Sequence, residues 1–230
     1  MFSLDHPFIL KLHATMKDHE ALYFVLEYCP GGELQLLLDS KEKLPEPTIV
    51  FYAAQITAAL DHIHQRHIVH RDLKLSNLLL DQHGYLKLID FGLCKQFSSS
   101  EDKSYTCCGT PEYLPPEMLN REGHAAPADW WAMGIIIYEL LTGITPFMDG
   151  GSVRTCQQLY ANILSKTYRF SFPPQASPEF ISMVSSLLNT SQVTRVLDLP
   201  CSMPPTVLHL LTMLRHAPHY AAAPYHATPP

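Results

Sequence analysis

The apolar positions of the chain follow a helical period over its best-defined stretch. Between Pro45 and His67 they recur at steps of three and four residues, the spacing of one face of a long amphipathic helix. These apolar residues are Ile49, Ala53, Ile56, Ala59, Leu60 and Ile63. Pro45 and Pro47 suit the first turn of such a helix, where a missing backbone N–H costs little. We therefore predict a helix with one buried face.

A second stretch, Asp129–Leu141, is apolar almost all round. It is shorter than the about 20 residues that cross a bilayer, so the pattern predicts the buried central helix of a domain. Weaker helical periods predict two amphipathic helices near Val153–Leu164 and Pro178–Leu188.

Short runs of β-forming residues predict two hairpins. Phe8–Lys17 and Ala21–Tyr28 flank a polar turn and predict an antiparallel pair. Asn77–Leu80 and Tyr85–Ile89 flank a turn with glycine and predict a second pair. The Pro-Gly-Gly sequence at 30–32 breaks the chain after the first pair, which indicates a hinge between a small sheet and a helical body.

Two segments lack such patterns. Cys94–Cys108 is rich in serine and is predicted to be a mobile surface loop. Residues 198–230 are rich in Pro, His and Ala, which predicts a disordered tail, with Val207–Leu214 as one short helix.

Charge and cysteine content exclude several classes of function. Lys and Arg number 16 against 22 Asp and Glu, a net charge of −6 without a dense basic run, so we expect no nucleic-acid partner. The six cysteines form no CxxC pair, which argues against zinc and a disulfide framework. Neither a signal peptide nor a membrane span is apparent. We expect a cytoplasmic protein, with the nucleus as a second compartment.

Candidate chemistry is concentrated in two motifs, His70–Asn77 and Asp90–Gly92. The predicted hairpin between them returns Asn77 and Asp90 to the same small volume. Phosphoryl transfer needs a divalent metal ion, a cation near the transferred group and a carboxylate that orients the attacking hydroxyl. The two motifs contain oxygen ligands for such a metal ion, a lysine that can serve as the cation and a carboxylate that can orient the hydroxyl.

Each residue of the motifs has a candidate role. Asp72 is the candidate base, and Lys74 is the cation beside the γ-phosphate. Asn77 and Asp90 are the candidate Mg²⁺ ligands, because this ion prefers oxygen. Taken singly, an Asp can merely cap a turn and Asp-Phe-Gly can occur by chance, but the spacing of the whole set favours a functional site.

The order His-Arg-Asp, four residues, Asn and then Asp-Phe-Gly resembles the eukaryotic protein kinases. Within them, the chain is similar to the AGC group of serine/threonine kinases and to ribosomal S6 kinase-related proteins, from about Asp5 to Arg195. Further matching motifs are His6–Ile9, Leu22–Tyr28, Gly31–Glu33, Cys108–Leu114 and Asp129–Ala132. The resemblance implies an α+β kinase fold, with a small-lobe remnant of two strands and a hinge at 1–29 and a mostly helical large lobe at 30–197.

The resemblance also implies ATP and Mg²⁺ as cofactors and assigns residues to them. Leu26, Glu27 and Cys29 would lie at the hinge beside adenine, Leu79 beneath its ring and Glu33 near the ribose. Phosphates and metal would meet the motif residues. The implied catalytic residues are Asp72, Lys74 and Asn77, and Lys74, Asn77 and Asp90 complete the implied nucleotide site.

Protein partners follow from the same resemblance. Glu33 and Glu139 match acidic positions that bind substrate arginines in AGC kinases, which implies protein substrates with basic Ser/Thr motifs. Ser76 stands where relatives often carry Glu, which weakens that preference. Thr106 matches the activation-loop site of an upstream kinase, with Arg71 as the partner of its phosphate; the alternative is an unmodified surface threonine.

Parts of the kinase pattern are missing from this sequence. In a kinase, the Gly-rich loop, the strand lysine and the helix glutamate would precede Asp5. By contrast, Glu117 and Arg195 match a glutamate and an arginine that pair with each other in the family. We therefore expect an N-terminally truncated product of a longer kinase, inactive or weakly active by itself. The alternative function is a catalytically inactive, kinase-like binding or scaffold module.

Overall fold

The computed structural model describes residues 4–148, 155–165, 169–192 and 195. The predicted tail at 198–230 and its helix lie outside the described residues. The fold class is α+β, as predicted, with a body of stacked helices and three small antiparallel sheets.

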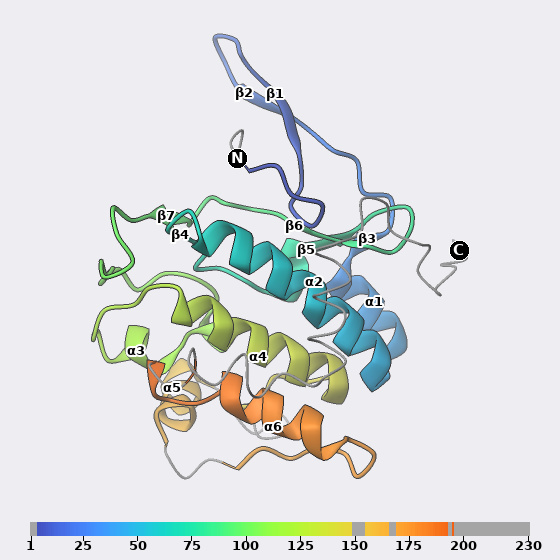
Figure 1. The fold of residues 1–230 in the computed structure, drawn as a ribbon, viewed down its shortest axis with the longest axis vertical. Helices are drawn as coiled ribbons and strands as arrows, with labels where there is room; N and C mark the ends of the chain where they lie inside the picture. Colours follow the sequence, from blue (N-terminus) through green and yellow to red (C-terminus); the bar gives the residue numbers. More distant parts are fainter. Residues whose placement is uncertain (1–3, 149–154, 166–168, 193–194, 196–230) are drawn as a thin grey trace.

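Three helices form the body. Helix α2 (Glu46–His64) packs on α4 (Pro127–Thr142), and α4 packs on α6 (Pro178–Leu187), so that α4 lies between the other two (Figure 1). All six apolar residues of the predicted α2 face are buried. A side chain at Gly134 would meet Leu187 at 2.8 Å, so the close approach of α4 and α6 requires glycine there. The central helix is confirmed.

Shorter helices surround this stack. Helix α1 spans Leu34–Lys41, α3 spans Pro116–Leu119 and α5 spans Cys156–Leu164. Two 3₁₀ turns, η1 (Leu75–Asn77) and η2 (Pro111–Tyr113), belong to the segments that carry the candidate chemistry.

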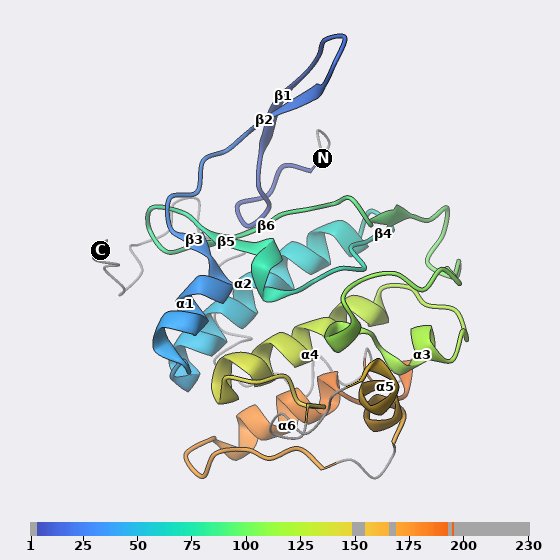
Figure 2. The ribbon, with the colours of Figure 1, turned by 180° about the vertical axis from the view of Figure 1, so that it is seen from behind.

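The strands form three separate sheets. β1 (Leu12–Lys17) pairs with β2 (Leu22–Leu26). In the second sheet β5 (Leu78–Leu80) lies between β3 (Gly32–Glu33) and β6 (Leu86–Leu88). The third sheet pairs β4 (Ile68–Val69) with β7 (Lys95–Gln96). Both predicted hairpins are confirmed, and the first projects away from the helices (Figures 1 and 2).

The predicted first strand is wrong over its initial residues. Only Leu12–Lys17 joins the hairpin, whereas Ile9 forms a parallel bridge to Leu88 of β6. Leu10 donates its N–H to the Leu88 carbonyl at 3.0 Å, and Leu88 donates to the Phe8 carbonyl at 2.8 Å. Phe8, Ile9 and Leu10 are buried. This contiguous apolar run removes more surface from water against the body than in a two-stranded hairpin.

The segment predicted as a mobile surface loop is partly held in place. Its start forms β7, and Ser104 pairs with His124 through two backbone hydrogen bonds of 2.9 and 2.8 Å. Ser104 is only 1% exposed. Serine content indicated solvent exposure, but pairing with a distant segment buries this particular serine.

A buried ion pair ties the last described residue to the body, as the resemblance implied. Arg195 Nη1 lies 2.7 Å from Glu117 Oε1, and Nη2 lies 3.1 Å from Oε2. The guanidinium also sits 5.0 Å from the Trp131 ring centroid. This bidentate, planar geometry suits arginine and excludes lysine as an equivalent.

Candidate active site

The loop between β4 and β5 is anchored by one buried carboxylate of helix α4. Asp129 accepts backbone hydrogen bonds from His70 and Arg71, each at 2.9 Å, and its Oδ2 lies 2.8 Å from His64 Nε2. Burial by itself raises the pKa of Asp129, but the hydrogen bond and charge of His64 together with His70 outweigh it, so the pKa lies below its usual value. Arg71 adopts φ +69°, a strained conformation that these two bonds hold.

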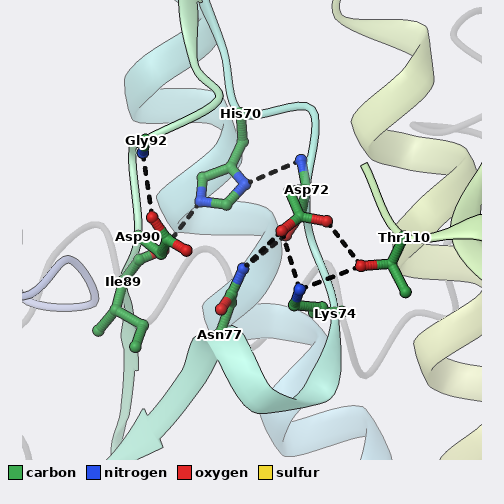
Figure 3. Close-up of polar contacts among 8 residues, drawn as sticks. All are labelled: His70, Asp72, Lys74, Asn77, Ile89, Asp90, Gly92 and Thr110. Carbon is green, nitrogen blue, oxygen red and sulfur yellow. Dashed lines mark hydrogen bonds and ion pairs between the residues drawn. The ribbon is translucent and has the colours of Figure 1, made fainter. Parts of the chain in front are cut away.

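Asp72 lies at the centre of a compact polar network (Figure 3). Thr110 donates its hydroxyl to Asp72 Oδ1 at 2.9 Å, and Lys74 Nζ lies 2.9 Å from Oδ2. Lys74 also donates to the Thr110 hydroxyl at 3.0 Å. Asn77 donates its side-chain amide to the Asp72 carbonyl at 2.8 Å. A carboxylate and a cation are thus held beside each other.

His70 connects this network to the turn that begins at Asp90. Its Nε2 donates to the Ile89 carbonyl at 2.9 Å, which leaves Nδ1 to accept from the Asp72 N–H at 3.4 Å. The His70 ring also meets the Phe91 ring edge-on at 5.1 Å. Ile89 donates its N–H to the Asn77 carbonyl at 3.0 Å. The two motifs are therefore joined through both side chains and backbone.

Asn77 and Asp90 offer oxygen atoms that suit a magnesium ion. The Asn77 amide nitrogen faces Asp72, so its carbonyl oxygen is left for another ligand. Asp90 is exposed and uses Oδ1 to accept the Gly92 N–H at 3.1 Å, which leaves its second oxygen. Among the described residues, no group of three or more His, Cys, Asp or Glu side chains could hold a metal ion. Mg²⁺ in such sites is usually bound by one or two protein ligands, and substrate phosphates supply further oxygen ligands.

The residues predicted to meet adenine and ribose form a connected row. Leu26 ends β2, and Glu27 Oε1 pairs with Lys87 Nζ at 2.7 Å. Across the sheet, Leu79 stands opposite both Lys87 on one side and Glu33 on the other. The row runs from the hinge after β2 to strand β5.

The hinge glycines and Cys29 adjoin this row. A side chain at Gly31 would lie 2.7 Å from the Leu80 carbonyl oxygen, so only glycine lets the hinge approach β5 so closely. Burial, followed by the charge of Glu27, raises the pKa of the Cys29 thiol, which keeps it protonated and unreactive at neutral pH.

Two basic side chains meet Ser104 within the segment predicted as a surface loop. Arg71 Nη1 and Lys95 Nζ donate to the Ser104 hydroxyl at 3.2 and 3.4 Å, while Thr106 is exposed. Burial, and then the Arg71 charge, lower the pKa of His124 to about 4. The pairing of Arg71 with a phosphate on Thr106 stays a prediction. Sequence reasoning missed Lys95 and Ser104, because one serine among many carried no distinguishing signal.

A second acidic site lies beside η2. Glu139 accepts a hydrogen bond of 2.5 Å from the Tyr113 hydroxyl. The pKa of Glu139 is raised to about 7, mainly because the carboxyl is buried; the Tyr113 hydrogen bond opposes this rise and the charges of Glu112 and Asp39 add to it. Glu139 is thus a buried acid whose ionised form a cation would stabilise. Glu33 is half-buried before helix α1.

Three features together are those of a protein kinase: the loop centred on Asp72, the second aspartate, Asp90, in the following turn, and the helical body with its buried ion pair between Arg195 and Glu117. The sequence matches the protein kinase domain family over residues 1–199, and the chain belongs to that family. In the described part of the chain, no helix has the length and apolar character that a bilayer crossing requires.

Individual relatives show to which group of protein kinases the chain is similar. It is 41% identical to a cAMP-dependent protein kinase catalytic subunit of Arthrobotrys oligospora, over 84% of this chain and 36% of that protein. It is 42% identical to protein kinase 2 of Dictyostelium discoideum, over 80% and 37% of the two chains. A RAC family serine/threonine-protein kinase homolog of the same organism is 39% identical, over 85% and 43%. The predicted AGC membership is confirmed, and the chain spans less than half the length of these relatives.

Proposed function

We propose that the protein containing this chain is an ATP-dependent protein serine/threonine kinase. The observation that carries the proposal is the Asp72, Lys74 and Thr110 triangle, in which every pair of side chains is in hydrogen-bond contact. A hydroxyl substrate that approaches this triangle meets a carboxylate that can accept its proton and a cation that can stabilise the transferred phosphoryl group.

The reaction divides among these residues in a definite way. The substrate oxygen forms a bond to the γ-phosphorus while the bond to the β-phosphate oxygen breaks, and the hydroxyl proton passes to Asp72. Lys74 lies beside the same carboxylate and would neutralise charge on the γ-phosphoryl oxygens. Mg²⁺ bound by Asn77 and Asp90 would neutralise the charge of the phosphates. Thr110 keeps the Asp72 carboxylate oriented.

Adenine binding is assigned to the row of residues between hinge and sheet. Leu26, Glu27 and Cys29 would meet the base along the hinge, Leu79 would pack under its ring, and Glu33 would reach the ribose. The connection from Glu27 through Lys87 to Leu79 supports this assignment, since it links the hinge to the strand that carries Leu79.

The substrate is proposed to be a protein with a basic residue near its Ser or Thr. The buried Glu139, whose pKa is raised by burial and by the like charges of Glu112 and Asp39, supports this choice, because a guanidinium would bring a positive charge to this cluster of acids. Phosphorylation of Thr106 by an upstream kinase is proposed to recruit Arg71, with Lys95 as a second cation and Ser104 displaced as their present partner.

A transfer assay tests the reaction. The purified full-length protein that contains this chain, MgATP and a Ser peptide with an upstream arginine are expected to give phosphopeptide, whereas the 230-residue chain by itself is expected to give little or none. Asp72→Asn is expected to reduce kcat by about 10²- to 10⁴-fold, the range for loss of a general base, with an unchanged melting temperature. Asp81→Asn, in a turn outside the triangle, is the matched Asp control. Failure of the folded protein to bind MgATP would favour the scaffold function instead.

The substrate class has its own test. The same assay with the peptide arginine replaced by glutamine is expected to raise KM in the wild-type protein. In Glu139→Gln the two peptides should behave alike, because the acid that would distinguish them is gone. Equal discrimination in both proteins would exclude Glu139 as the arginine contact.

A further inference from the structure

Glu27 joins three segments that are distant in sequence. Its backbone N–H donates to the Lys11 carbonyl at 2.9 Å, and its Oε2 accepts the Lys11 N–H at 3.2 Å. Its Oε1 lies 2.7 Å from Lys87 Nζ. The carboxylate therefore bridges the entry to β1 and the middle of β6, at the point where the projecting hairpin meets the body.

The Glu27–Lys87 ion pair is shielded from water to an unusual degree for this part of the molecule. The Lys87 side chain is 13% exposed and that of Glu27 is 29% exposed. By comparison, the neighbouring Lys11–Asp5 pair spans 3.9 Å with side chains 60% and 92% exposed. Screening by water weakens the exposed pair much more than the shielded one.

The position of Lys87 gives this pair a consequence for the nucleotide. Lys87 stands directly opposite Leu79 across the β5–β6 ladder, and Leu79 is the proposed floor of the adenine site. Glu27 belongs to the proposed hinge. The contact between the Glu27 and Lys87 side chains therefore connects the hinge, which would lie at the edge of the base, with the part of the sheet that would lie below its ring.

We propose that the Glu27–Lys87 ion pair is a strut that fixes the hinge relative to strand β5 and so sets the geometry of the adenine site. Glu27 and Lys87 are positioning residues, because their charges would act on the adenine site indirectly, through the positions of the Glu27 backbone and of Leu79. The inference rests on the proposed ATP-dependent function for its consequence, whereas the strut itself can be measured without nucleotide.

Paired substitutions separate the ion pair from the other contacts of these residues. Glu27→Gln keeps an oxygen for the Lys11 N–H, and Lys87→Met keeps most of the apolar stem, so each removes mainly the charge. Lys87→Arg is the conservative variant that restores it, and Lys11→Gln is the control for a neighbouring exposed pair.

The first measurement is hydrogen exchange of the whole protein without ligand. Glu27→Gln and Lys87→Met are expected to speed amide exchange over residues 22–29 by roughly three- to tenfold, the effect of losing a partly shielded contact in a region of low local stability. Lys87→Arg and Lys11→Gln should exchange like the wild type. Unchanged exchange in both charge-removing variants would overturn the strut.

The second measurement compares two ligands that share a phosphate chain. Calorimetry with MgADP and with magnesium tripolyphosphate is expected to show about tenfold weaker MgADP binding in the charge-removing variants, a loss of one partly buried pair, with tripolyphosphate binding unchanged. Equal losses for both ligands would contradict a role at adenine. A wild-type protein that binds neither ligand would refute the proposed function and the adenine role together, while hydrogen exchange still decides whether the strut exists.

Discussion

The helical body and the β1–β2 hairpin present their apolar side chains in opposite ways. In the body, Trp131 and Ile137 on α4 are completely buried, and the apolar residues next to them on the helix are at most 8% exposed. In the hairpin, Leu22 and Phe24 are 64% and 61% exposed, and Val25, which points to the opposite face of the strand, is also exposed. Both faces of the hairpin are thus accessible in the described structure, and a two-stranded sheet alone is marginal in water.

This contrast separates the two halves of the candidate active site. Asp72, Lys74 and Asn77 are attached through Asp129 to the central helix of the body. Glu27, by comparison, is attached through one ion pair and a few backbone hydrogen bonds. The part that would handle phosphate is held by a full core, whereas the part that would hold adenine depends on few contacts.

The largest expected effect comes from breaking the buried ion pair of the body. Arg195→Met leaves the Glu117 carboxylate buried without its cation, and we expect a loss of about 3–5 kcal/mol in unfolding free energy. Urea unfolding followed by tryptophan fluorescence measures it. Lys11→Met, which breaks an exposed pair, should cost less than about 1 kcal/mol. Equal costs would contradict the contrast between the regions.

A cavity in the central helix should have a slightly smaller effect. Ile137→Ala removes buried methyl groups from the 0%-exposed centre of α4, with an expected cost of about 3 kcal/mol. The same urea titration applies. A cost below about 1 kcal/mol would mean that the packing around α4 collapses to fill the space.

Acid pH should destabilise the body through His124. Its pKa is about 4 in the fold and about 6.5 when unfolded, so the unfolded chain binds more protons between these values. Stability should therefore fall as pH drops from 6.5 towards 4, by roughly 2 kcal/mol for this group. His124→Gln should flatten that slope in unfolding experiments at pH 7 and 5, and His19→Gln in the exposed hairpin turn should not. A slope unchanged by His124→Gln would assign the acid sensitivity elsewhere.

The smallest expected effect lies on the hairpin. Phe24→Ser should change the unfolding free energy by no more than about 0.5 kcal/mol, because the side chain is already mostly in water. A loss above about 1 kcal/mol would show that this face is covered in solution and that the contrast with the body is smaller than the described structure indicates.

Much of the fold was predictable because the responsible signals are local. The period of three and four in α2, the uniform apolar character of α4 and the glycine turn between β5 and β6 each depend on a short stretch of chain. The error at Phe8–Leu10 has the opposite origin. Its β-forming residues were identified correctly, but their partner, Leu88, lies far away in the sequence.

The candidate site divides in the same manner. Spacing within two short motifs was enough to nominate Asp72, Lys74, Asn77 and Asp90, and their mutual contacts run through segments close in sequence. The partners of Arg71 and Glu27 were not foreseeable. Ser104 and Lys87 are ordinary polar residues in their own segments, and nothing local distinguishes them from their neighbours.

The sequence by itself therefore determined the long helices, the two hairpins and the family, and it nominated the residues of the candidate site, because periodicity, turns and motif spacing are properties of neighbouring residues. Only the tertiary structure decided that Ser104 meets Arg71 and Lys95 and that Glu27 meets Lys87. Such contacts depend on how the helices and sheets pack against one another, since packing brings together charges that the chain itself keeps far apart.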